Sequence, residues 1–102
     1  MDVRNVGALS AFWTRHPDAA RPLQRWLLIV RNAQWRNPMD CRQTFPAADR
    51  VRLEDGQTVT VFNIKGNSYR LVAAILYPAG LVVVRAVMTH PEYDQNAWKE
   101  TL

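Results

Sequence analysis

The sequence predicts an α+β fold in which an antiparallel β-sheet is covered on one face by helices. The stretch from Val59 to Asp94 contains three β-branched, largely apolar runs separated by two turn signals, which predicts an antiparallel meander. The chain before residue 45 instead carries apolar side chains at helical spacing. We therefore expect the strands to form one sheet and the preceding helices to cover it.

A short strand and two helices are expected at the N-terminus. Asp2 to Asn5 is a candidate edge strand, and residues 7–15 form a helix that His16-Pro17-Asp18 ends. A second helix is expected from about Ala19 or Arg21 to about Asn32, with Pro22 in its first turn. The apolar stripes are Leu9, Phe12 and Trp13 on the first helix and Leu23, Trp26, Leu27 and Val30 on the second. Trp13, Trp26, Trp35 and Trp98 are therefore expected to pack against the sheet rather than stack on bases.

Cap and turn signals divide the rest of the chain. Asn37-Pro38-Met39-Asp40 has a capping asparagine and a proline at the first helical position, so a short helix begins there and ends before Phe45-Pro46. Arg50 to Glu54 is expected to pair with Thr58 to Ile64 across the Asp55-Gly56 turn. A third helical segment is expected from Pro91 to about Thr101.

The Gly66-Asn67 turn sets the register of the central hairpin. If these two residues form the loop, Asn63 lies opposite Arg70, because a two-residue hairpin fixes the pairing. One face is then apolar and consists of Phe62, Ile64, Tyr69, Leu71, Ala73 and Ile75. The other face carries Asn63 and Arg70 at one end, and we expect the sheet to be covered on one side only. The polar end of the open face is the candidate cleft.

The position of Arg85 depends on the second turn, at Pro78-Ala79-Gly80. A three-residue loop places Arg85 opposite Ala73 on the apolar face, whereas a loop of two or four residues places it on the face of Arg70. A slip of one residue reverses the face of every side chain, so the sequence leaves both positions open.

Length and composition exclude several classes of protein. The chain of 102 residues is expected to form one domain, residues 1–102. It has no apolar run near the ~20 residues that cross a bilayer, and its N-terminus lacks a signal pattern, so we expect a cytoplasmic protein. Cys41 is the single cysteine and His16 and His90 are the two histidines. We therefore expect no disulfide, no metal site and no cofactor.

The basic charge indicates a polyanionic or acidic partner. The formal net charge is +4, and eleven of the thirteen basic residues are arginines, which suit bidentate recognition of phosphate or carboxylate. The first 53 residues hold nine basic and four acidic side chains, which makes this half the better candidate for a diffuse polyanion surface. A solvated arginine face remains the alternative.

His90 lies at the end of a predicted strand and directly before a proline-started helix. Loops at strand ends are common places for functional groups, and a histidine there can transfer a proton near neutral pH. The alternative is a structural helix cap formed by Thr89 or His90. Glu92 and Tyr93 follow within one helical turn.

Four segments of the chain resemble the HigB toxin family, within the wider RelE-like group. They are HPDAARPLQRW (16–26), AQWRNPMDCRQTFPAAD (33–49), VFNIKGNSYRLVAAILY (61–77) and VRAVMTHPEYD (84–94). The resemblance implies a curved antiparallel sheet packed by N-terminal helices, with a short C-terminal helix. It also implies metal-independent cleavage of mRNA, usually on the translating ribosome, and inhibition by a helix-turn-helix antitoxin of the HigA type.

The resemblance also implies roles for single residues. Arg70 matches the arginine of the YRL motif and is expected to clamp the scissile phosphate, and His90 is expected to act as general acid or base. Tyr93 and Lys65 complete the predicted catalytic set, and Asn63, Arg85 and Glu92 are the predicted RNA-binding residues. The wider group often carries extra lysines on the strand that reads Val61-Phe62-Asn63-Ile64 here, so proton transfer can be arranged differently. Lys65 can also be a surface residue beside the turn.

Two other classes of function fit the same residues. A non-catalytic RNA- or ribosome-binding module uses the arginines without needing His90. A protein-interaction domain binds an acidic partner and never contacts RNA. A neighbouring reading frame for a small helix-turn-helix protein favours the toxin.

Overall fold

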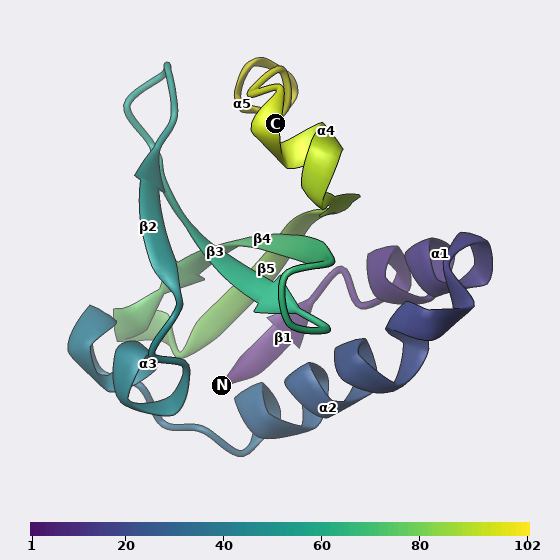
Figure 1. Ribbon diagram of the computed structural model, residues 1–102. Coiled ribbons are helices and arrows are strands. Elements are labelled where there is room, and N and C mark those ends of the chain that lie inside the picture. The colour runs from purple at the N-terminus through teal and green to yellow at the C-terminus, as the bar shows by residue number, and fades with distance from the viewer.

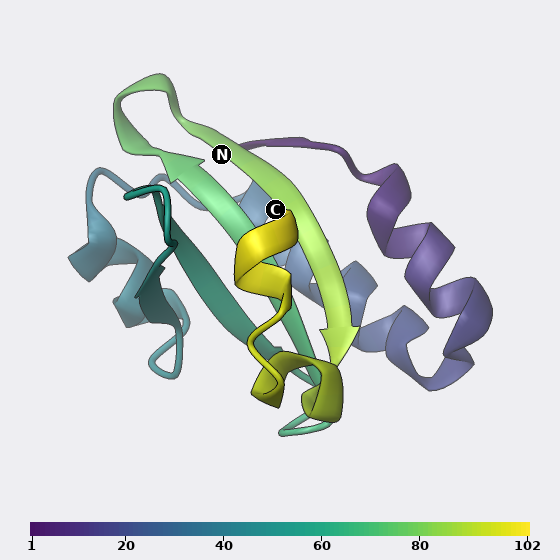
Figure 2. The same cartoon turned by 90° about the horizontal axis from the view of Figure 1, so that it is seen from above.

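The computed structural model describes residues 1–102 and contains one five-stranded sheet with the strand order β1-β5-β4-β3-β2 (Figures 1 and 2). The strands are β1 (Asp2–Arg4), β2 (Asp49–Arg52), β3 (Thr58–Ile64), β4 (Tyr69–Leu76) and β5 (Leu81–Thr89). All neighbours are antiparallel except the edge strand β1, which is parallel to β5. The predicted α+β class is confirmed, and Figure 2 shows the bowed course of β5.

The N-terminal helices begin and end close to the predicted residues. They are α1 (Gly7–Arg15), the 3-10 turn η1 (Pro17–Ala19), α2 (Ala20–Arg31) and α3 (Pro38–Thr44). The Asn37 side chain caps α3 by accepting a hydrogen bond from the Asp40 backbone N–H at 3.0 Å, which satisfies one of the donors that a helix start leaves free. Figure 1 shows these helices along one side of the sheet.

The main core lies between the sheet and these helices. It contains seventeen buried residues, among them Trp26, Phe62 and Leu71. The Phe62 ring packs edge-on against Trp26 and Phe45 at centroid distances of 5.4 and 5.2 Å, an arrangement that aromatic pairs prefer. The predicted apolar face of the hairpin is therefore confirmed, and so is the register, since Asn63 pairs with Arg70.

The opposite face of the sheet is not bare, so the expectation of a cover on one side only was wrong. A second cluster of six buried residues lies there: Leu53, Val59, Val61, Val72, Met88 and Trp98. Trp98 belongs to the C-terminal segment, which folds back over this face (Figure 2). The polar end of the face, at Asn63 and Arg70, lies beyond this cluster.

The C-terminal helix is interrupted. The predicted single segment consists of α4 (His90–Asp94) and α5 (Trp98–Thr101), separated at Asn96, which has φ 61°. Asparagine tolerates this left-handed conformation better than most residues. The break turns Trp98 back so that its Nε1–H donates to the Tyr93 carbonyl at 3.0 Å. None of the helices has the length and apolar character needed to cross a bilayer.

The second hairpin loop has one of the lengths that the sequence left open, but a β-bulge decides the position of Arg85. Leu76 pairs with Leu81, so the loop has four residues and includes a 3-10 turn, η2 (Tyr77–Ala79). Farther along, Val84 pairs with Ala73 and Ala86 with Val72, which leaves Arg85 as the extra residue of a β-bulge. The two alternatives considered from the sequence both assumed regular pairing without a bulge. In the structure Arg85 has no partner on β4, and the pairing shifts by one residue on either side of it.

Candidate functional site

A polar groove of about 440 Å³ lies at the open end of the sheet. Four parts of the chain supply its walls: α3, the segment that leads into β2, the central strands, and α4. The lining residues are Arg42, Pro46, Ala47, Ala48, Asp49, Val61, Asn63, Arg70 and Tyr93. The structure therefore brings three of the predicted site residues, Asn63, Arg70 and Tyr93, to one surface.

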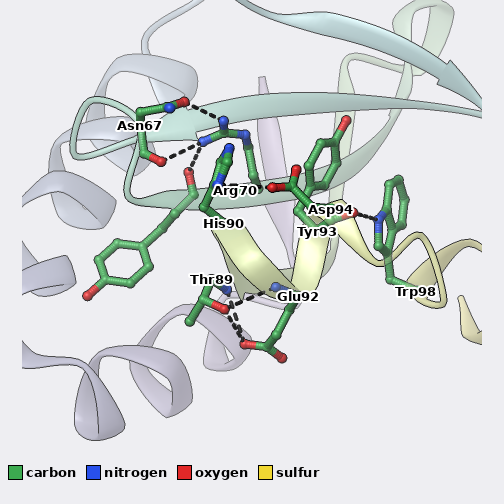
Figure 3. A network of polar contacts seen from close by, with 9 residues as sticks. Asn67, Arg70, Thr89, His90, Glu92, Tyr93, Asp94 and Trp98 are labelled. Atoms are coloured by element: carbon green, nitrogen blue, oxygen red, sulfur yellow. Dashed lines mark hydrogen bonds and ion pairs between the residues drawn. The ribbon is translucent and has the colours of Figure 1, made fainter.

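Arg70 is held in this groove by the turn that precedes it. Its Nη1 donates to the carbonyl oxygens of Asn67 at 3.2 Å and Tyr69 at 3.1 Å, and its Nη2 donates to the Asn67 side-chain oxygen. Figure 3 shows the two contacts of the guanidinium with Asn67, one to the backbone carbonyl and one to the side chain. These bonds fix the orientation of the planar guanidinium, and a fixed donor is what transition-state stabilisation requires.

The charge of Arg70 has no carboxylate partner. The residue is 7% exposed, yet its hydrogen-bond acceptors are neutral and it takes part in none of the ion pairs of the structure. Buried charges are normally paired. A largely buried cation with neutral partners, at the wall of a groove, is therefore suited to an anionic ligand such as a phosphate.

Tyr93 lies beneath this cation. The Arg70 guanidinium carbon is 5.5 Å from the centre of the Tyr93 ring, and Trp98 stacks on that ring at 5.2 Å. Burial, followed by the charges of Asp49 and Asp94, raises the pKa of Tyr93 above its ordinary value, although the Arg70 charge opposes this. The phenol consequently stays protonated near neutral pH and can donate a hydrogen bond.

His90 occupies the first position of α4, beside the groove rather than in its lining. Its backbone N–H donates to the Ser68 carbonyl at 3.1 Å, which ties α4 to the turn that holds Arg70. Its Nδ1 lies 3.2 Å from Asp94 Oδ2, and its side chain is 37% exposed. The Asp94 contact leaves Nε2 as the ring nitrogen available to a substrate (Figure 3).

The helix cap belongs to Thr89. The Thr89 hydroxyl accepts from the Glu92 backbone N–H at 3.3 Å, and the Glu92 carboxylate accepts from the Thr89 backbone N–H at 3.2 Å. These reciprocal bonds are a capping box. Of the two alternatives for a cap, Thr89 is correct and His90 is not. Glu92, a predicted RNA-binding residue, uses its carboxylate inside this cap (Figure 3).

Lys65 and Arg85 lie apart from Arg70. Lys65 Nζ is 2.6 Å from Asp18 Oδ2 in an ion pair with the 3-10 turn η1, and the Tyr69 hydroxyl donates to the other oxygen of the same carboxylate. These two bonds hold the pKa of Asp18 below its ordinary value. Arg85 is half-buried in the bulge and forms no ion pair. The structure therefore groups neither residue with Arg70.

Sequence reasoning missed Asn67, Asp94 and Arg42. The sequence marks Asn67 only as a turn residue, whereas its side chain orients Arg70. Asp94 is four residues after His90, and this i, i+4 spacing on a predicted helix was a usable signal. Arg42 reaches the groove from α3, and nothing in the local sequence separated it from the other arginines. No three His, Cys, Asp or Glu side chains of the chain come together as a potential metal site.

Comparison with known proteins assigns the family. The family described as "HigB_toxin, RelE-like toxic component of a toxin-antitoxin system" matches residues 19–96. The chain belongs to this family. The match runs from the end of η1 to Asn96, so it includes every residue of the polar groove as well as His90 and Asp94.

Curated HigB proteins are similar over part of their length. The chain is 32% identical over 65 residues to the mRNA interferase toxin HigB of Escherichia coli K12, and equally to the mRNA interferase HigB of Escherichia coli O157:H7 and of Shigella flexneri. The aligned part is 64% of this chain and 61% of each relative. The chain therefore spans less than two thirds of these HigB proteins.

Proposed function

We propose that this HigB family protein is an endoribonuclease that cleaves mRNA, an mRNA interferase. The observation that carries the proposal is Arg70, a buried cation with neutral partners beside a protonated tyrosine and close to the His90–Asp94 pair. The relatives named mRNA interferase support it. These groups match what cleavage of RNA by its own 2′-hydroxyl needs, namely charge stabilisation and proton transfer.

The proposed reaction is an internal displacement at phosphorus. The 2′-oxygen attacks the adjacent phosphorus while its proton passes to a base, and the bond from phosphorus to the 5′-oxygen breaks. The 5′-oxygen receives a proton as it leaves, so the products are a 2′,3′-cyclic phosphate and a 5′-hydroxyl. Arg70 neutralises the extra negative charge of the five-coordinate intermediate state, and Asn63 adds a donor from the neighbouring strand.

His90 is the proposed group for proton transfer. With Asp94 at Nδ1, the neutral imidazole keeps Nε2 free to accept the 2′-hydroxyl proton, which is the arrangement of a base oriented by a carboxylate. Tyr93 then serves as a hydrogen-bond donor to the phosphate or the leaving oxygen. Lys65, Arg85 and Glu92 remain candidates, with Lys65 required to leave Asp18 before it can act. The mechanism uses protein groups alone, without a metal or a cofactor.

The finer assignments follow the family. We propose that residues 1–102 act as one HigB domain in the cytoplasm, that cleavage takes place on the translating ribosome, and that a HigA-like helix-turn-helix antitoxin inhibits the protein. Induction should then arrest growth, and co-expression of the antitoxin should relieve the arrest. Healthy growth with abundant folded protein would argue against the toxin.

RNA end mapping tests the proposal directly. After induction, transcripts should carry new 5′-hydroxyl ends opposite 2′,3′-cyclic or 3′-phosphate ends. Cleavage of ribosome-bound mRNA should not depend on any divalent ion beyond the magnesium that the ribosome itself needs. New 5′-phosphate ends produced by the purified protein would contradict the mechanism. Tight RNA binding without new ends would favour the non-catalytic module instead.

A further inference from the structure

A second groove, of about 330 Å³, lies between α2 and the turn of the β3–β4 hairpin. Three cationic side chains line it, Arg21, Arg25 and Lys65, above an apolar floor that includes Trp26, Ile29 and Phe45. Figure 1 shows the turn between β3 and β4 close to α2. The mechanism proposed above uses none of the α2 residues, so this cationic groove needs its own explanation.

The two arginines are free to bind an anion. Arg21 and Arg25 are both exposed, and neither takes part in an ion pair of the structure. They are four residues apart on α2, so they lie on the same face of the helix, one turn apart. Lys65 differs because Asp18 already pairs with it. The net charge of the groove is therefore carried by the arginine pair.

The floor contains a buried donor without an acceptor. Trp26 is 2% exposed and lines the groove, and its indole Nε1–H is the one buried side-chain donor that finds no partner in the protein. Such groups are rare in folded proteins, and an unmade hydrogen bond of this kind is unfavourable. Trp26 is a lining residue of the groove, so this unmade hydrogen bond belongs to the floor of the site.

The cationic groove meets the Arg70 groove at Asn63, which lines both. The last pair between β2 and β3 joins Asp49 to Val61, so Asn63 lies beyond the end of β2 and is exposed at the edge of the sheet. Phe45 lines the cationic groove, while Pro46 and Ala47 line the Arg70 groove. The two grooves therefore flank one short segment and share Asn63 as a lining residue.

We infer that the cationic groove holds the RNA strand that flanks the scissile phosphate. An RNA strand with one phosphate at Arg70 carries further phosphates at regular intervals along its backbone, and Arg21 and Arg25 offer repeated cations beyond Asn63. Because the two grooves share Asn63, one RNA strand can occupy both, whereas an acidic polypeptide has no need to reach Arg70. This inference rests on the proposed function, because it takes Arg70 as the site of the scissile phosphate.

The test compares two double variants of equal charge change. Arg21→Gln/Arg25→Gln removes both cations of the groove, whereas Arg15→Gln/Arg31→Gln removes two exposed arginines that line neither groove. The probe is a labelled 2′-O-methyl RNA of about twelve nucleotides, a length within the range of single-strand binding sites. Methylation of the 2′-oxygen prevents cleavage during the binding measurement.

The groove variant should bind this RNA about 25-fold more weakly in ~0.1 M salt, because two phosphate contacts on a single strand are lost. For the same reason, the slope of log affinity against log salt concentration should become shallower by about 1.4. The control variant should change the affinity by less than about threefold, because isolated surface charges are screened at this salt. A trinucleotide probe, too short to reach beyond Asn63, should bind all three proteins alike. With a cleavable RNA, the loss in kcat/KM should come from KM.

Equal losses for the two variants, or an equal loss with the trinucleotide, would overturn the inference. A groove variant that binds RNA like the control but no longer binds the antitoxin would overturn it as well, and would assign the groove to a protein partner. The outcomes separate this inference from the proposed function. A wild-type protein that never cuts RNA contradicts the enzyme, whereas the binding comparison still decides what the groove holds.

Discussion

The two faces of the sheet differ in what the same strands bury: one face buries the apolar main core, and the other also buries a charged side chain. On β4, Leu71 is 0% exposed among the seventeen residues of the main core, while its neighbour Arg70 is 7% exposed on the other face. Alternation along a strand places these side chains on opposite sides. The helix-covered face supplies stability, and the rigid strand then holds a buried charge on the face where only six residues form a core.

The difference shows how a small protein keeps a charge out of water without neutralising it. The acceptors of Arg70 are two backbone carbonyls and one amide, all within the turn and the start of β4. Because none of them carries a full negative charge, the guanidinium remains available to an anion. A carboxylate at the same place would compete with the substrate phosphate.

Breaking the helix-covered face should have the largest effect. Phe62→Ala removes a ring that packs against Trp26, Trp35 and Phe45, and truncation of a buried phenylalanine costs about 3–5 kcal/mol. Urea unfolding should show this loss. Asn63→Ala, the next residue on the same strand but exposed on the opposite face, should change the free energy of unfolding by no more than about 0.5 kcal/mol. Similar losses for both variants would contradict the division between the faces.

Removing a proton-transfer group beside the polar groove should lower activity and leave the fold intact. His90→Ala should slow cleavage by about 10²- to 10⁴-fold, the usual contribution of a general acid or base. The side chain is partly exposed and the cap of α4 is made by Thr89, so unfolding should change little. Cleavage rates measured at saturating RNA, with binding measured separately, decide the matter. If the folded variant cut RNA at the wild-type rate, His90 would not transfer the proton, and Tyr93 or Lys65 would be the remaining candidates.

Arg70 combines a catalytic role in the proposed mechanism with structural hydrogen bonds to the turn. Arg70→Gln removes the cation and keeps a polar side chain, and the cleavage rate should fall about 10²- to 10³-fold, as for the loss of an electrostatic donor. Arg70→Ala is a poorer choice, because it removes three hydrogen bonds to the turn and the start of β4. A glutamine variant that remains fully active would show that the guanidinium does not contact the scissile phosphate.

Local rules predicted most of the fold. Gly66 fixed the turn and hence the Asn63–Arg70 pair, and Asn37-Pro38 fixed the start of α3, because turn and cap preferences depend on a few neighbouring residues. Arg85 could not be placed because a β-bulge is set by how two strands meet. Trp98 was recognised as a packing residue, but its place over the opposite face depends on the break at Asn96.

The candidate site was only partly predictable. Strand pairing places Asn63 beside Arg70, and the short helix after β5 brings Tyr93 to the same groove. The sequence predicted both the pairing and the helix. The pairing of Lys65 with Asp18 joins residues 47 positions apart, and no local signal reports such a contact. The contact of Asn67 with Arg70 is local, yet several rotamers of each side chain are possible and only the packed structure selects one.

The capping box should give the smallest effect and the sharpest contrast with His90. Thr89→Ala removes the hydroxyl that accepts from the Glu92 backbone N–H, and loss of such a cap costs about 1 kcal/mol. Thr89→Ser should restore most of that loss because the serine hydroxyl can accept the same bond. Since Thr89 itself transfers no proton, the cleavage rate of the folded alanine variant should stay within about tenfold of the wild-type rate, in contrast to the loss expected for His90→Ala. Urea unfolding and cleavage assays on Thr89→Ala and His90→Ala should therefore give opposite patterns, one variant less stable and the other less active. If both variants lost stability and activity together, α4 would act as a single structural unit, and the specific role of His90 would have to be abandoned.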